Sequence, residues 1–143
     1  MSIPLWVKVV IGFVGTLAAL VFIGGYILFN AGCSNQPLAI EKSPDGSLEA
    51  VIFQRDCGAT TGFSTQVSIF RSWLPRGTSS GNIFVSDTDH GKAPSGVGGG
   101  PDVKVKWVSE RELVIAHHHL ARVFLSEPNW GAVKITYEKN GSR

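Results

Sequence analysis

The sequence predicts an N-terminal single transmembrane α-helix followed by a small all-β antiparallel domain, a sandwich or an open barrel of about seven short strands. Residues 9–29 carry no charged side chain. After residue 30 no helical periodicity of comparable length appears, and short alternating apolar and polar runs are separated by turn residues. We therefore expect an anchor at 1–30, a linker at 31–37 and an extracytoplasmic β domain at 38–143.

The uncharged run is long enough to cross a bilayer as one helix. At the rise of an α-helix it extends about 30 Å, the thickness of the hydrocarbon core. Trp6 and Tyr26 lie near its ends, where aromatic rings prefer the membrane interface. Lys8 precedes the run, and the next basic residue is Lys42. The positive-inside rule therefore predicts a single-pass membrane protein, with its N-terminus in the cytoplasm and residues 31–143 outside.

Two other interpretations of this segment compete with an uncleaved anchor. A cleaved secretory signal has a shorter apolar region than this run. Ala31-Gly32-Cys33 resembles the end of a lipobox, in which Cys33 would become the acylated first residue of a structural lipoprotein. Asn30 stands where that pattern has Leu or another aliphatic residue.

The chain has two cysteines, Cys33 and Cys57. Outside the cytoplasm such a pair is more often a disulfide than two free thiols, so a Cys33–Cys57 bridge is the first expectation. The alternatives are an acylated Cys33 with a free Cys57, and a nucleophilic Cys57. A nucleophilic cysteine needs a lowered pKa and a nearby base, and Asp56 beside Cys57 would raise the pKa of the thiol.

Turn signals divide the β domain into short strands. Ser43-Pro44-Asp45-Gly46 is a strong turn, and 48–55 is apolar on both faces, as in a central strand. The last third alternates most clearly, with Val103, Val105 and Trp107 facing one way. The predicted strands are 38–42, 48–55, 65–70, 83–85, 103–107, 113–116, 122–125 and 133–138.

One stretch of the domain carries a resemblance to a known group of proteins. Residues 55–69 read RDCGATTGFSTQVSI, preceded by Ser-Pro-Asp-Gly and by the Gly32-Cys33 pair. Together these motifs resemble a group of small, uncharacterised bacterial membrane-anchored envelope proteins with no assigned activity. The resemblance covers 32–70 and implies a bacterial envelope protein, with its anchor in the inner membrane and its β domain in the periplasm. It supplies no catalytic residue.

His117-His118-His119 is the most conspicuous cluster of potential metal ligands. On an extended strand, His117 and His119 project to the same face, which suits zinc. His90, Asp87 or Asp89 are possible third ligands, but no spacing selects one of them. The competing interpretation is a solvated strand end at which the histidines happen to adjoin.

Other polar and aromatic residues indicate candidate surfaces for binding a partner. The loops 58–64 and 88–101 are rich in glycine and polar residues, and Trp73 lies in a predicted loop as Trp130 does in a predicted turn. Exposed aromatic side chains often mark binding hot spots, whereas buried ones close the ends of a sandwich. The candidate contact residues are Thr60, Thr61, Phe63, Trp73 and Trp130.

Composition narrows the classes of function. Thirteen basic and eleven acidic residues nearly balance, which argues against nucleic acid as a partner. No motif indicates a cofactor. We therefore expect a non-enzymatic membrane-anchored envelope protein whose β domain binds a protein or wall partner, in an immunity, inhibitor or accessory role. The alternatives are a metal-dependent or thiol enzyme using His117 and His119 or Cys57, and the acylated structural lipoprotein.

Overall fold

The computed structural model describes residues 4–30, 32–58 and 61–141 and divides the chain into two compact units, Met1–Gly32 and Cys33–Arg143. The first unit contains the helix α1 (Leu5–Asn30). Its segment Leu5–Tyr26 is the one helix in the described residues that is long and apolar enough to cross a membrane, and none of it is buried. A membrane anchor and a signal sequence both have these properties.

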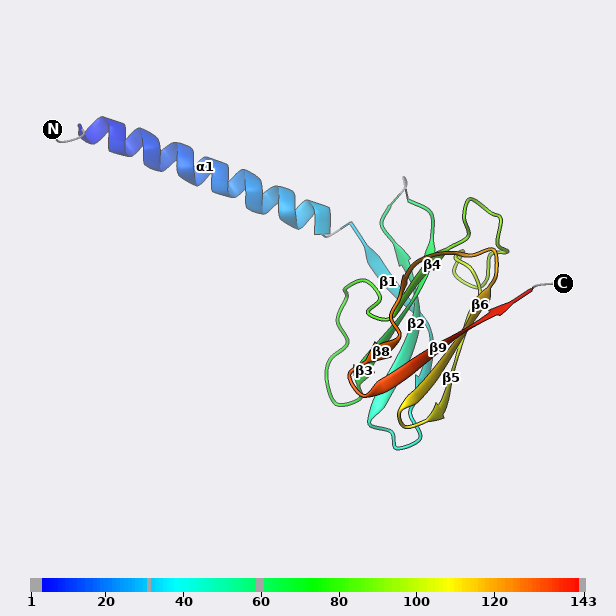
Figure 1. Cartoon of the computed structure of the whole chain (residues 1–143). Coiled ribbons are helices and arrows are strands. Elements are labelled where there is room, and N and C mark those ends of the chain that lie inside the picture. Colours follow the sequence, from blue (N-terminus) through cyan, green and yellow to red (C-terminus); the bar gives the residue numbers. More distant parts are fainter. Residues whose placement is uncertain (1–3, 31, 59–60, 142–143) are drawn as a thin grey trace. The chain divides into compact units, whose positions relative to one another are not determined.

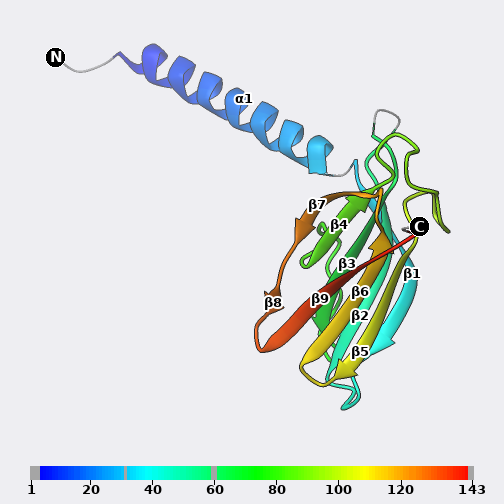
Figure 2. The same cartoon turned by 45° about the vertical axis from the view of Figure 1, so that its right-hand side comes forward.

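The second unit is a two-sheet β sandwich, shown in Figures 1 and 2. The first sheet has the strand order β1-β2-β3-β4-β7, and the second has the order β5-β6-β9-β8. The sandwich was one of the two predicted architectures, and the sheets do not close into a barrel. The strands are β1 (Ser34–Lys42), β2 (Leu48–Asp56), β3 (Ser64–Arg71), β4 (Phe84–Asp87), β5 (Val103–Ser109), β6 (Glu112–His118), β7 (Arg122–Ser126), β8 (Asn129–Trp130) and β9 (Val133–Asn140).

One strand pair departs from the antiparallel expectation. β6 and β9 run parallel, with Leu113 opposite Ile135. Parallel neighbours need a long crossover connection. Here the chain leaves the second sheet after β6, forms β7 at the edge of the first sheet, and returns through β8 to β9.

The core lies between the two sheets, where the alternation of each strand points its apolar side chains inward. Phe84, Leu113 and Ile115 are fully buried. The complete cluster is Ala50, Ile52, Val67, Ile69, Ile83, Phe84, Val103, Val105, Leu113, Ile115, Val133 and Ile135. Both sheets contribute to it, so neither would be stable without the other.

The outer face of the first sheet is also covered, which explains the doubly apolar pattern of β2. Val51 and Phe53 are each only 3% exposed although they do not belong to the core cluster. The loop at residues 72–82 (green in Figure 1) packs over this face. The Gly81 amide donates to Gln66 Oε1 at 2.7 Å, and Arg76 pairs with Glu49.

β1 begins at Ser34, inside the segment 31–37 that was expected to be a linker. It pairs with β2 over its whole length, from Ser34 opposite Asp56 to Lys42 opposite Glu49. The predicted turn between them forms, with Gly46 at φ 71°. The ladder hydrogen bonds of β2 extend the first strand beyond the residues whose own pattern indicated a strand.

Candidate functional site

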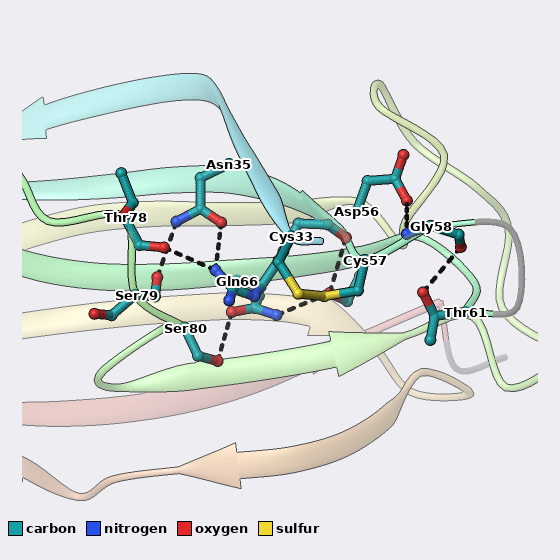
Figure 3. The surroundings of a disulfide bond; sticks show 12 residues. Cys33, Asn35, Asp56, Cys57, Gly58, Thr61, Gln66, Thr78, Ser79 and Ser80 are labelled. Carbon is teal, nitrogen blue, oxygen red and sulfur yellow. Dashed lines mark hydrogen bonds between the residues drawn. A yellow bond between two sulfur atoms is a disulfide. The ribbon is translucent and has the colours of Figure 1, made fainter. Parts of the chain in front are cut away.

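One end of the sandwich is held together by the predicted disulfide. Cys33 and Cys57 are bonded, with their Cα atoms 3.9 Å apart, at the point where β1 begins and β2 ends (Figure 3). The β1–β2 register explains the pairing, because Ser34 lies opposite Asp56 and the cysteines are the next residues along. The bond uses both sulfur atoms, so neither an acylated Cys33 nor a thiolate at Cys57 is compatible with this state.

In the loop that follows the disulfide, two polar side chains of described residues bond to the loop's own backbone. Asp56 Oδ1 accepts the Gly58 amide, and Thr61 Oγ1 donates to the Gly58 carbonyl (Figure 3). Thr60 lies outside the described residues. Phe63 is 45% exposed, and its ring lies where a side chain at Gly99 would need to be. Phe63 therefore packs against the 88–101 loop and joins the two loops that were predicted to contact a partner.

The structure separates the two histidines that were proposed as metal ligands. His117 is buried and lies beside Phe84, with ring centroids 5.2 Å apart. β6 ends at His118, so the strand alternation does not continue to His119, which is exposed. The rings that lie together are those of His118 and His119. In the described part of the chain, no group of three or more His, Cys, Asp or Glu side chains is arranged to hold a metal ion.

The acidic residues that were considered as third ligands form ion pairs instead. Arg122 makes a two-pronged contact with Asp87 and also approaches Asp89, which pairs with Lys92. Partial burial raises the pKa of Asp87, but hydrogen bonds from Arg122 and the Asp89 amide lower it more, and the net pKa lies below its ordinary value.

This ion pair gives a pH-dependent prediction. Asp87→Asn is expected to lower the free energy of unfolding at neutral pH by about 1 kcal/mol, because the pair is partly exposed. A depressed pKa stabilises the fold above the unfolded-state value and stops doing so as pH falls through the folded-state value. In urea unfolding series, the difference between wild type and variant should therefore begin to shrink below about pH 4, the unfolded-state value, and disappear only when the pH falls below the lowered folded-state pKa. The exposed Asp102→Asn serves as the control, and an equal difference at all pH values would contradict the assignment.

The opposite end of the domain brings together two tryptophans, one from a predicted loop and one from a predicted turn. Trp73 follows β3 and Trp130 belongs to β8, and both line one pocket of about 430 Å³ with Arg71, Arg111, Asp45 and Glu110. We call this the tip pocket. Trp73 is 65% exposed, whereas Trp130 is half-buried and packs against the core. β1 alone separates the tip from Cys33 by about 30 Å, given its length and the rise of a strand.

Charged groups surround the two rings of the tip pocket. The guanidinium carbon of Arg71 lies 5.6 Å from the Trp73 ring centroid, a cation–π arrangement. Hydrogen bonds from the hydroxyls of Ser43 and Ser47 lower the pKa of Asp45 to about 2. Asp45 is therefore ionised at neutral pH, and the pocket presents both signs of charge beside its aromatic surface.

No protein-family model, curated protein or solved structure matches this chain. The geometry of the tip pocket is therefore the main guide to function. Sequence reasoning selected Trp73 and Trp130 separately and missed Arg71 and Arg111. Arg71 had a local signal, since it ends a strand two residues before a tryptophan, but nothing near Arg111 indicated that it would face them.

Proposed function

We propose that this protein is a membrane-anchored, non-enzymatic protein of the bacterial envelope whose β sandwich binds a protein partner through the tip pocket. The observation that carries the proposal is the joint position of Trp73 and Trp130 in one pocket. Tryptophan and arginine are the side chains that most often dominate binding energy at protein interfaces. The sandwich leaves Trp73 largely in solvent, although burying it would remove apolar surface from water.

Anchor and compartment are supported by separate features. The helix α1 has the length and hydropathy of a membrane span. Lys8 precedes it and no basic residue follows before Lys42, which favours a cytoplasmic N-terminus and a periplasmic β domain. The Cys33–Cys57 disulfide is consistent with an oxidising compartment. In such an arrangement α1 keeps the sandwich at the membrane while the tip pocket receives the partner.

Replacing Trp73 tests this function directly. Trp73→Ala is expected to weaken partner binding about 30-fold, the loss typical of a hot-spot tryptophan. The matched control is Phe124→Ala, because Phe124 is 60% exposed and also carries an arginine, Arg122, over its ring. The control should change affinity less than about twofold, as surface residues outside a hot spot do.

The measurement begins with the full-length protein in its native membrane. A photo-crosslinking residue at Ser47, which lines the tip pocket, identifies the bound protein by mass spectrometry. Binding of that protein to wild type and both variants is then measured in detergent. Equal affinity for wild type and Trp73→Ala, or no cross-linked protein at all, would contradict the proposed function. Matching unfolding temperatures of the variants exclude misfolding as the cause.

A further inference from the structure

The edge strand β5 presents an unpaired side to solvent. It is the first strand of the second sheet and pairs only with β6 among the described strands. A groove of about 700 Å³ is lined by five consecutive residues of β5, 104–108. Side chains on a strand alternate between faces. Because residues from both faces of β5 line the groove, the groove reaches the edge of β5, where no other described strand pairs with it.

The groove has one firm wall and a partly apolar floor. The wall is the end of β1, where the Glu41 carbonyl accepts the indole N–H of Trp107 at 3.0 Å. The floor is formed on the outer face of β6 by Val114 and Ala116, which are half-buried. We call this feature the β5 groove; it is lined by residues 104–108 together with Glu41, Lys42, Pro44, Val114, Ala116 and Glu138.

Two lysines give the β5 groove its chemical preference. Lys104 and Lys106 are exposed and lie two residues apart on the outer face of β5. Neither has a carboxylate within 4 Å among the described residues. The carboxylates near them are Glu112 and Glu138 on the same outer face and Glu41 at the wall, and Glu138 lies two strands away, in line with Lys104 and Ala116. Lys42 also lines the groove, so its lysines outnumber its carboxylates. A strand added at the edge of β5 would place alternate side chains beside both lysines.

A hollow beside the β5–β6 turn shares lining residues with both the β5 groove and the tip pocket. Pro44 and Val108 line both the groove and a hollow beside the β5–β6 turn. Glu110 and Arg111 line both that hollow and the tip pocket. An extended chain lying along β5 can therefore pass round the turn to the two tryptophans.

We propose that the free edge of β5 binds an extended acidic segment of the partner as an added strand, with carboxylates at alternate positions beside Lys104 and Lys106. Main-chain hydrogen bonds along the edge supply affinity, and the alternate side chains supply specificity. This inference rests on the proposed function, because it names the chemistry of the partner that the tip pocket binds.

A defined peptide tests the charge requirement. The probe is a short fluorescein-labelled peptide with glutamate at every second position and valine or threonine between, titrated into full-length protein in detergent at physiological ionic strength. Lys104→Glu with Lys106→Glu is expected to weaken binding about tenfold or more. The matched control, Lys134→Glu with Lys139→Glu on β9, makes the same change of net charge away from the edge and should change affinity less than about twofold.

N-methylated peptides test the main-chain pairing. Only alternate amides of an added strand face its neighbour. Methylating one alternate set of peptide amides should abolish binding, while methylating the other set should leave it nearly unchanged. Equal effects of the two sets, or equally tight binding of inorganic polyphosphate, would overturn the proposal in favour of non-specific attraction between charges.

The outcomes separate this inference from the proposed function. If the peptide does not bind wild type while Trp73→Ala still removes the cross-linked partner, strand addition is overturned and the tip pocket stands. If the peptide binds as expected while Trp73→Ala has no effect, the role of the tip pocket is overturned and the β5 edge stands. Lysines on edge strands also hinder pairing between copies. If the Lys104→Glu, Lys106→Glu variant self-associates but binds the peptide as tightly as wild type, the lysines serve only to keep copies apart, and the proposal is overturned.

Discussion

Replacing Cys57 with serine is expected to lower the free energy of unfolding of the β domain by about 3.5 kcal/mol. The disulfide joins residues separated by 24 positions. The bond restricts the unfolded chain by closing this loop, whereas in the folded state the β1–β2 ladder already holds the two ends together. The variant should unfold about 15 °C below wild type for a domain of this size.

Tryptophan fluorescence during heating of the full-length protein in detergent measures this difference. Cys33→Ser is the matched control and should lose the same stability, since either replacement opens the same loop. Reduced wild type should have the same unfolding temperature as the two variants. Identical unfolding temperatures for oxidised and reduced wild type would contradict the prediction. An intact mass of the non-reduced protein that is two hydrogen atoms below the thiol form reports the bond itself, whereas added acyl groups at Cys33 would report a lipoprotein.

Replacing Phe84 with alanine is expected to lower the free energy of unfolding by about 4 kcal/mol. Phe84 is fully buried on β4, which lies between β3 and the edge strand β7 of the first sheet. Its ring stacks with Tyr137 at a centroid distance of 5.7 Å and lies close to His117. Alanine would leave a cavity between the two sheets. Tyr137 and His117 could not fill it, because each is held in place by its own strand.

The matched control for this substitution is Phe124→Ala, which removes the same side chain from an exposed position. It should change the unfolding free energy by less than about 0.5 kcal/mol, as surface substitutions usually do. Phe84→Leu should fall between the two because it keeps most of the buried volume. Urea unfolding followed by circular dichroism gives all three values, and similar losses for Phe84→Ala and Phe124→Ala would contradict the assignment of Phe84 to the core.

The tyrosine beside Phe84 shows why some core contacts were not predictable. The Tyr137 hydroxyl shares its one proton between the carbonyls of Ile83 and Glu127. Burial raises the pKa of the tyrosine, with a further contribution from Glu127. The alternation of 133–138 correctly predicted which face Tyr137 occupies. The identity of its acceptors depends on where β4 and the chain after β7 lie in space, which no local pattern describes.

For a similar reason, the prediction for the two cysteines was confirmed whereas the prediction that His117 and His119 share one face was wrong. Cys33 and Cys57 were paired correctly because only two cysteines exist and because outside the cytoplasm they favour oxidation. His117 and His119 were expected on one face, but β6 ends between them. The end of a strand depends on its neighbours: the His119 amide bonds to the Asn140 carbonyl, where the chain leaves the parallel pair.

The sequence by itself determined the apolar helix, the disulfide and most of the strands, because each follows from composition or from the alternation of apolar and polar residues over a short stretch. Hydrophobic alternation requires only that one face be buried, so it located strands such as 103–107 without naming their neighbours. Only the tertiary structure decided that the sheets form a sandwich, that β6 and β9 run parallel, and that Trp73 and Trp130 share a pocket. These features depend on how distant segments share one core, and the free energy of that packing belongs to the assembled domain, not to any segment.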